Sequence, residues 1–142
     1  VRLTKEQSQN IKNFTIGNKY GRVTWEGNTN ILNIFKGRDG HLFNNILEIL
    51  EIAHSSVTVY EEEDLKPALG GGLNKPAIVY LYELYPQEIK HELQNSEILN
   101  IDQVTIYEKH KNKLRRIVRA NGGTFLSFKG HNGELCFSVS GF

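Results

Sequence analysis

The sequence has little cysteine, no methionine and no long hydrophobic run. Cys136 is the only cysteine among the 142 residues, so no intrachain disulfide can form, which fits a reducing compartment. No apolar stretch approaches the roughly 20 residues that cross a bilayer. No basic start precedes an apolar run and a cleavage site, so we expect neither a signal peptide nor a membrane partner. Because the chain lacks methionine and begins with Val1, we expect a fragment of a longer protein.

A strong excess of charge of one sign is also lacking. The 17 basic and 16 acidic side chains leave a formal net charge of +1, which gives no whole-chain attraction to nucleic acid or membrane. The hydrophobic fraction is 39%, with 7 Phe, 6 Tyr and 1 Trp, more aromatic residues than a disordered tail carries. No repeat, low-complexity tract or linker divides the chain, so we expect residues 1–142 to form a single domain with one core.

The front half predicts a helix followed by strands. Thr4 to Gln7 has the form of a capping box, and the helical pattern that it opens breaks at Phe14. Val23 and Trp25 alternate with polar neighbours, as in a half-buried strand. The segments expected after the helix are a strand, turn and strand over 14–27, a loop over 28–40, a buried helix or a helix running into a strand over 41–53, and a strand over 57–60.

The back half predicts a loop over 66–76, a central strand over 77–82, two helices and a hairpin. Pro86 suits the first turn of a helix that runs to about Leu99. Asp102 suits the cap of the next helix, and Asn121-Gly122 suits its left-handed end. Asn132-Gly133 is the preferred dipeptide for a tight hairpin turn, here between strands over 124–128 and 134–140. Together these elements predict an α+β domain, with helices packed on a mostly antiparallel sheet.

No catalytic or metal-binding pattern stands out. The glycine-rich segment 69–75 lacks the flanking strand and helix and the Lys-Ser or Lys-Thr of a phosphate-binding loop, so a structural or partner-contact loop is favoured. The five histidines show no ligand spacing, and the pair Glu88 and His91 is of a kind that surface helices produce by chance. Cys136 falls in a strand pattern and is interpreted as a packed small residue. We expect no metal, cofactor or small-molecule substrate.

The strongest local charge bias lies in the last predicted helix. Arg115, Arg116 and Arg119 could bind RNA phosphates or an acidic partner. The alternative is the exposed face of an amphipathic helix, with cations near the C-terminal end, where the helix dipole favours them. This alternative is favoured because the charges spread around the helix and no aromatic stacking residues interleave. The other cations of this helix are Lys109, Lys111 and Lys113.

Three further segments of the chain form a recognisable set. The first is Phe14-Thr15-Ile16-Gly17 with Tyr20-Gly21 and Gly27. The second and most specific consists of Lys66-Pro67, Gly70, Gly72-Leu73-Asn74 and Pro76-Ala77, and the third consists of Gly123, Phe125, Phe128, Gly133, Phe137, Val139 and Phe142. Together they resemble the opening, the Lys-Pro…Gly-x-Gly-Leu-Asn-x-Pro-Ala signature and the closing pattern of one family, the autopeptidase domain that closes the ninety-eight-kilodalton and GLFG nucleoporins.

The resemblance implies a six-stranded sheet with flanking helices and a role at the nuclear pore complex, in the nucleus. It implies a binding domain that anchors a GLFG-repeat nucleoporin to a β-propeller nucleoporin of the cytoplasmic face or to a scaffold nucleoporin, in support of protein and mRNA transport. Gly70, Gly72, Leu73, Asn74 and Phe142 are the candidate partner contacts. Asn74 could instead bond its loop onto the sheet, and this structural role is favoured.

Some members of this family cut themselves between a terminal Phe and a following Ser, with a neighbouring His assisting the attack of the hydroxyl. Here the position that matches the His is Gly141, and no residue follows Phe142 in the sequence. We therefore expect a binding domain rather than a working enzyme in this form. Self-cleavage after Phe142 and RNA binding by the basic helix are the alternatives.

Overall fold

A computed structural model describes residues 11–142 of the chain. The helix predicted from Thr4 lies outside the described residues, apart from its last part. Strand β1 already begins at Ile11, three residues before the strand predicted from Phe14. Its pairing with β2 explains the difference, because Ile11 lies opposite Thr29 and extends the ladder beyond the segment that alternates clearly in sequence.

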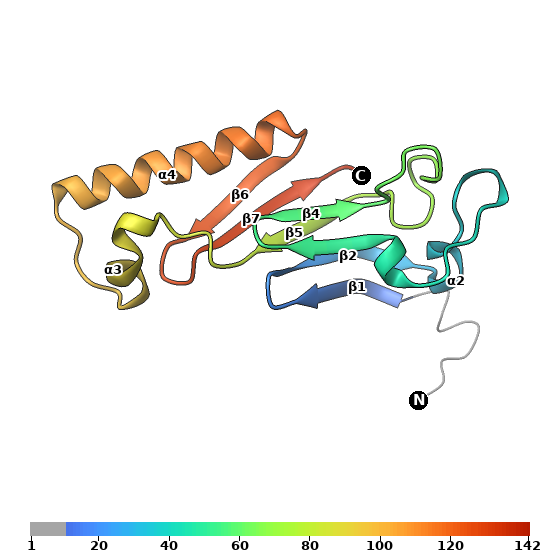
Figure 1. The fold of residues 1–142 in the computed structure, drawn as a ribbon, viewed down its shortest axis with the longest axis horizontal. Helices are drawn as coiled ribbons and strands as arrows, with labels where there is room; N and C mark the ends of the chain where they lie inside the picture. The colour runs from blue at the N-terminus through green and yellow to red at the C-terminus, as the bar shows by residue number, and fades with distance from the viewer. Residues whose placement is uncertain (1–10) are drawn as a thin grey trace.

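The main sheet has five strands in the order β1-β2-β5-β7-β6, and every neighbouring pair is antiparallel. Figure 1 shows this sheet running along the molecule. The central position of β5 confirms the prediction from its apolar sequence. The strands are β1 (Ile11–Asn18), β2 (Gly21–Thr29), β5 (Ala77–Leu81), β6 (Thr124–Lys129) and β7 (Glu134–Val139).

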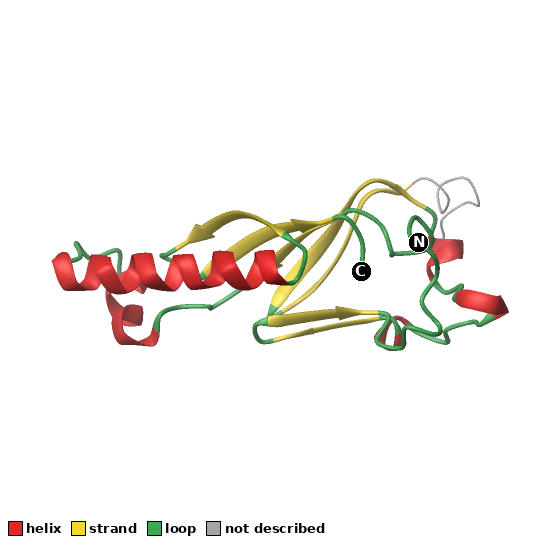
Figure 2. Cartoon of the chain, turned by 90° about the horizontal axis from the view of Figure 1, so that it is seen from above, coloured by secondary structure: helices red, strands yellow, loops and turns green. Residues whose placement is uncertain are grey.

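The six-stranded sheet that the resemblance implied is not found among residues 11–142. The segment predicted as a strand over 57–60 pairs elsewhere, in a separate two-stranded hairpin of β3 (Leu50–Ala53) and β4 (Ser56–Val59). This hairpin lies against one face of the main sheet, as Figure 2 shows from above. Asn18 Nδ2 donates a hydrogen bond of 2.8 Å to the Ile52 carbonyl and fastens the hairpin to the turn after β1.

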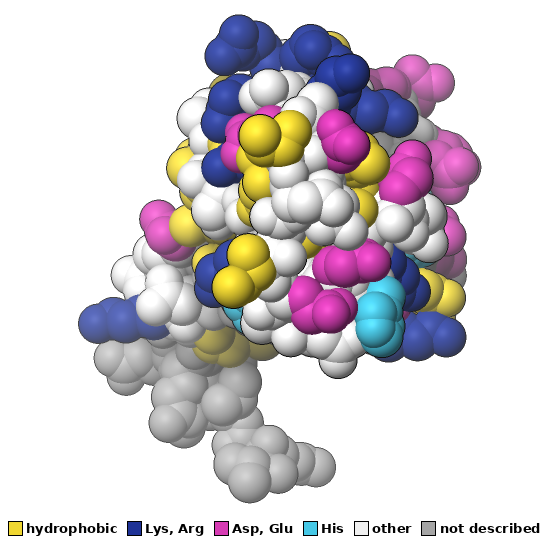
Figure 3. All heavy atoms as spheres, turned by 90° about the vertical axis from the view of Figure 1, so that its left-hand side faces the viewer, with side chains coloured by type: hydrophobic (Ala, Val, Ile, Leu, Met, Phe, Trp, Pro, Cys, Tyr) yellow, Lys and Arg dark blue, Asp and Glu magenta, His cyan; other side chains and the backbone are white. Residues whose placement is uncertain are grey.

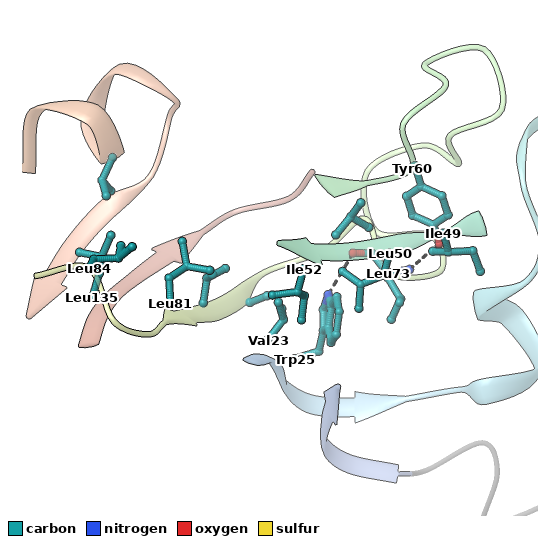
Figure 4. Packing of buried hydrophobic residues seen from close by; sticks show 14 of the residues in the cluster. Val23, Trp25, Ile49, Leu50, Ile52, Tyr60, Leu73, Leu81, Leu84 and Leu135 are labelled. Atoms are coloured by element: carbon teal, nitrogen blue, oxygen red, sulfur yellow. Dashed lines mark hydrogen bonds between the residues drawn. The ribbon is translucent and has the colours of Figure 1, made fainter. Parts of the chain in front are cut away.

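The core fills the space between the hairpin and the sheet. Val23 of β2 and Val79 of β5 are fully buried, and they belong to one apolar cluster with Leu50, Ile52 and Val59 of the hairpin. Figure 4 shows how this cluster continues along the sheet to Leu81, Leu84 and Leu135. The alternation that predicted β2 is therefore the alternation that builds the core.

Short helical turns lie where we predicted a loop over 28–40 and, over 41–53, a buried helix or a helix running into a strand. The turns are α2 (Ile31–Ile34) and the 3₁₀ turns η1 (Arg38–Gly40) and η2 (Ile46–Glu48), before β3. For 41–53 the second alternative is the closer one, because a short helical turn leads into β3. Asn30 Oδ1 accepts from the Leu32 amide and Asn45 Oδ1 from the Leu47 amide, each at 2.9 Å. These asparagine caps start α2 and η2 at positions that hydrophobic spacing alone does not mark.

The helix predicted from Pro86 is shorter than expected. It comprises η3 (Gln87–Ile89) and α3 (Lys90–Gln94), and it ends five residues before Leu99. It ends where Ser96 adopts a left-handed φ of +52°, and the Asn95 side chain just before donates through Nδ2 to the His91 carbonyl at 2.8 Å. Side-chain bonds of this kind compete with continued helix.

The long helix α4 (Ile101–Ala120) is capped by Asn100 rather than by Asp102. Asn100 Oδ1 accepts from the Gln103 amide at 2.9 Å, and Gln103 Oε1 accepts from the Asn100 amide at 3.0 Å. This reciprocal pair forms a capping box and leaves Asp102 in the first turn, where its charge suits the helix dipole. At the other end Gly122 has φ of +82°, which confirms the predicted left-handed stop.

The closing hairpin of β6 and β7 is confirmed, but its turn is longer than the tight turn predicted at Asn132-Gly133, because Lys129 pairs with Glu134 and residues 130–133 form the loop. Gly133 has φ of +65° in the turn, and Asn132 Oδ1 accepts from the Glu134 amide at 3.1 Å. A bulge at Leu126 lets both Phe125 and Phe128 lie opposite inward residues of β7. No helix among the described residues has the length and apolar character needed to cross a bilayer.

Candidate functional site

The described chain ends in a site organised by Asn74. The Phe142 amide donates to Asn74 Oδ1 at 2.7 Å, and Asn74 Nδ2 donates to the Pro67 carbonyl at 2.9 Å. Only 5% of Asn74 is exposed. One buried carboxamide therefore connects the glycine-rich loop to the last residue, and it uses both its acceptor and its donor to do so.

Trp25 packs beneath this connection. Its ring centroid lies 6.0 Å from that of Phe142 and 5.9 Å from that of Phe14. Its Nε1 donates to the Leu73 carbonyl at 3.0 Å, which Figure 4 shows as a dashed line. Since Trp25 and Leu73 are both fully buried, the indole fixes the loop through a bond shielded from water.

Tyr60 holds the other side of the same loop. Its hydroxyl accepts from the Leu73 amide at 2.9 Å and donates to the Ile34 carbonyl at 3.2 Å. Burial raises the pKa of Tyr60, and the bond from the Leu73 amide opposes part of that rise. Gly72 has φ of +52°, and a Cβ added there would collide with the Tyr60 hydroxyl. Glycine is therefore required at that position on both counts.

A groove of about 680 Å³ begins at this site and runs along the molecule. Its floor is the face of the main sheet around Leu81, Leu135 and Phe137, and Phe142 lies at its end. One wall is α4 and the other is the turn of the β3–β4 hairpin, the two elements that lie on the same side of the sheet in Figure 2. A concave surface with this largely apolar lining suits an apolar chain segment.

Polar side chains also line the groove, and two of them are histidines. His110 of α4 bonds the Leu84 carbonyl at 2.6 Å through Nε2, and His54 of the hairpin turn lies 3.5 Å from the Glu83 carbonyl. Lys113 and Glu83 are the charged side chains of its lining. These groups could orient a bound segment while the apolar floor supplies contact area.

The predicted contact residues of the loop separate into two groups. Leu73 and Asn74 face inward, whereas Gly70 is exposed and needs to be glycine only because its φ is +96°. Gly141 and Phe142 both line the groove. A Cβ added at Gly141 would collide with Leu69 Cδ1 and lie 2.8 Å from Asn74 Oδ1.

The three predicted arginines lie on different sides of α4. Arg115 and Arg119 line a small hollow beside β6, which shares only Gly123 with the lining of the groove, while Arg116 lines neither. Figure 3, which looks at the end of the molecule formed by α4 and α3, shows Lys and Arg gathered along its upper rim. The structure thus brings Arg115 and Arg119 together at one hollow, and Arg116 lies apart from them.

The other residues considered for chemistry are placed as follows among residues 11–142. No group of three or more His, Cys, Asp or Glu side chains is placed to hold a metal ion in that part of the chain. Cys136 is buried, and its burial raises the pKa of the thiol, which keeps it protonated. His91 lies near Glu97 rather than forming a site with Glu88.

Sequence reasoning missed three contributors to the site. Trp25 and Tyr60 were expected only as strand residues, and Ile117 fell within the last predicted helix without being singled out. The first two could have been found, because Trp25 and Tyr60 stand in apolar strand patterns. A buried indole or phenol needs a hydrogen-bond partner, which marks both as residues that bond another segment. Ile117 gave no such signal, because its place in the wall of the groove depends on where α4 packs.

Comparison with known proteins agrees with this geometry. The family model described as Nup98-96 autopeptidase S59 matches residues 1–142. The chain is 28% identical over 140 residues to the Nup98-Nup96 nuclear pore complex protein of Dictyostelium discoideum, covering 98% of this chain and 6% of that protein. It is also 28% identical over 142 residues to the nucleoporin NUP145 of Saccharomyces cerevisiae, covering 99% and 10%. The chain thus spans a small part of the relatives that it matches.

Solved structures give the same result. The autopeptidase domain of Chaetomium thermophilum Nup145N, crystallised as a mutant fused to Nup145C N, superposes with a TM-score of 0.71 at 28% identity, over 99% of this chain and 85% of that one. The C-terminal domain of Candida glabrata NUP116 shares the fold, with a TM-score of 0.65 at 22% identity over 98% and 81%. From the family match over its whole length, the chain belongs to the Nup98-96 autopeptidase family of nucleoporins, whose relatives found here are nuclear pore complex proteins.

Proposed function

We propose that this domain anchors a nucleoporin within the nuclear pore complex by binding a segment of another nucleoporin in the groove that ends at Phe142. The observation that carries this proposal is the apolar groove itself, in a domain of this family. A folded end of this kind gives a repeat-bearing chain a fixed position, which a disordered repeat region cannot hold alone. Such anchoring supports the transport of protein and mRNA through the pore.

Two features support a nucleoporin segment as the occupant. The relative at 28% identity was crystallised fused to Nup145C N, a piece of a second nucleoporin. The groove starts where the last residue is held, so a segment that approaches Phe142 can continue along the floor formed by β5 and β7. We infer that the partner is the counterpart of Nup145C or a β-propeller nucleoporin of the cytoplasmic face, and that Phe142 contacts it.

The test uses a matched pair of substitutions on α4. Ile117 is 48% exposed and lines the groove, whereas Val104 is 45% exposed on the same helix and does not. We expect Ile117→Asp to weaken binding to the purified partner nucleoporin by about tenfold or more, because a carboxylate then enters an apolar contact. Val104→Asp should change the affinity by less than about twofold, as rim positions outside an interface do.

Binding would be measured by calorimetry with purified counterparts of Nup145C and of a β-propeller nucleoporin. Circular dichroism of both variants shows whether the fold is intact. Equal affinities for the two variants would exclude the groove as the docking site. Absence of binding to either partner by the folded wild-type chain would exclude the anchoring role.

Self-cleavage after Phe142 is a second candidate, favoured by the family's autopeptidase description and by the fixed amide of Phe142. A serine appended after Phe142 would attack the Phe142 carbonyl with its hydroxyl. The peptide C–N bond would break, the freed amine would take the proton, and water would then hydrolyse the ester. Gly141 has no group that could move this proton.

The corresponding experiment appends a serine and introduces Gly141→His. A side chain at position 141 needs space that Leu69 occupies, and Leu69 is 72% exposed and so is able to move. We expect cleavage only with both changes present, and a faster reaction when Leu69→Ala is added. If none of these variants is cut, self-cleavage is excluded and only the binding role remains.

A further inference from the structure

The outer edge of β6 is a second surface with the geometry of an interface. β6 is the last strand of the sheet and pairs on one side only, with β7, among residues 11–142. An edge of this kind presents backbone N–H and C=O groups that a further strand can use. The side chains at this edge include Leu126, which is 49% exposed.

A row of cations on α4 borders this edge. Lys111, Arg115 and Arg119 are spaced four residues apart and so share one flank of the helix. The Arg115 guanidinium lies 4.8 Å from the centroid of the Phe125 ring of β6. Arg115 and Arg119 line a hollow of about 210 Å³ together with residues 123–125, which lead into β6.

These cations have no carboxylate partner within the described part of the chain. The ion pairs found there involve Arg22, Lys66, His91 and Lys129, and none of them involves α4. Arg115 donates only to the neutral Asn112 side chain, at 3.2 Å. By helical spacing, Glu108 is the one acid of α4 on this flank, so the flank keeps a net positive charge next to the unpaired edge of β6.

We propose that an extended acidic segment of another protein adds as a strand to the outer edge of β6, with alternate carboxylates over Arg115 and Arg119. The spacings agree. Alternate residues of a strand lie roughly 6.6 Å apart on one face, and residues four apart in a helix lie roughly 6 Å apart along its axis. The groove uses other side chains of α4, among them Leu114 and Ile117, so the two surfaces differ on the helix and share only Gly123 in their linings.

The observations favour an acidic peptide over the other possible occupants. A second copy of this chain would bring an identical row of cations to the edge, and like charges across a pair are unfavourable. Single-stranded RNA gains most from exposed aromatic rings, but Phe125, the ring at this hollow, is already covered by Arg115. The bulge at Leu126 interrupts the ladder and suits a short segment rather than the long flat strands of a fibril.

The test measures binding of a short labelled peptide of alternating glutamate and threonine to the full 142-residue chain by fluorescence anisotropy. We expect saturable binding that weakens with salt and is lost when the glutamates are replaced by glutamine. The double variant Arg115→Glu with Arg119→Glu should weaken binding by about tenfold or more. The control Lys109→Glu with Arg116→Glu makes the same charge change outside this flank and should weaken it by less than about threefold.

Amide hydrogen exchange shows whether a strand is added. We expect exchange of amides in 124–129 to slow when the peptide binds, and exchange in β1 at the other edge to stay unchanged. Peptide binding without that protection would overturn strand addition. Equal effects of the two double variants, or binding of an oligouridine RNA but not of the peptide, would overturn the proposal as a whole.

Discussion

The cluster around the chain end and the helix α4 differ in how completely their groups are satisfied. In the cluster formed by Trp25, Tyr60, Leu73, Asn74 and Phe142, each buried polar group described above has a partner within the molecule. On α4, one face packs on the sheet, while other apolar side chains are exposed and the cations form no ion pair with a described residue. The cluster therefore stabilises the fold, whereas α4 provides a surface that a partner can bind.

The largest effect is expected from Trp25→Ala, which would break the cluster at its centre. Trp25 is fully buried between two aromatic rings and bonded to the Leu73 carbonyl. The loss of the ring and of this bond should lower the free energy of unfolding by about 3–5 kcal/mol. Urea denaturation measures this change, and a loss below about 1 kcal/mol would show that the cluster does not carry the stability assigned to it.

A smaller effect is expected from Tyr60→Phe, which keeps the ring and removes the hydroxyl. The Leu73 amide and the Ile34 carbonyl would lose that partner, at a cost of about 1–3 kcal/mol. Tyr20→Phe is the control, since the Tyr20 hydroxyl makes no hydrogen bond to a described residue.

The same substitution also has a pH signature. Burial raises the pKa of Tyr60 above its ordinary 10.0 in the folded state, so the folded chain holds this proton more tightly than the unfolded chain does. The contribution of the protonated Tyr60 hydroxyl to the free energy of unfolding is complete below about pH 10. It is lost as the pH rises from there through the pKa that Tyr60 has in the folded state. The stability difference between wild type and Tyr60→Phe should therefore narrow above pH 10. A constant difference over that range would contradict the assignment.

The smallest effect is expected on α4, from Arg116→Glu. This side chain is exposed and makes no ion pair in the described chain, so the free energy of unfolding should change by less than about 0.5 kcal/mol. Thermal denaturation beside the wild type is sufficient to measure it. If Arg116→Glu lowered the free energy of unfolding as much as Tyr60→Phe does, the proposed difference between the chain-end cluster and α4 would be wrong.

The sequence predicts those parts of the fold that depend on local patterns. Val23 and Trp25 predict β2 by alternation, the apolar run after Pro76 predicts the central strand, and Asn132-Gly133 predicts the last turn. Competing local signals produced the error at α4, because Asn100 and Asp102 are both suitable caps. The reciprocal bonds with Gln103 decided between them, and these depend on side-chain geometry rather than on residue type alone.

The site could be predicted only in part. The glycine-rich loop and Phe142 were identified from their residues, but the bond that joins them connects positions 68 residues apart. The groove depends on α4 and the β3–β4 hairpin lying on the same face of the sheet, which no local pattern specifies. The six-stranded sheet was implied by the resemblance, and residue preferences could not correct this expectation, because they do not fix which strands pair with each other.

The position of the only tryptophan provides a natural optical reporter. Trp25 is fully shielded from solvent, and its indole lies 6.0 Å from the ring of the last residue. Any event that displaces that residue, whether a ligand entering nearby or an extension of the chain, will alter the surroundings of a single chromophore. Emission from the unlabelled protein can therefore be used to follow occupancy at that end, without the need to introduce a dye.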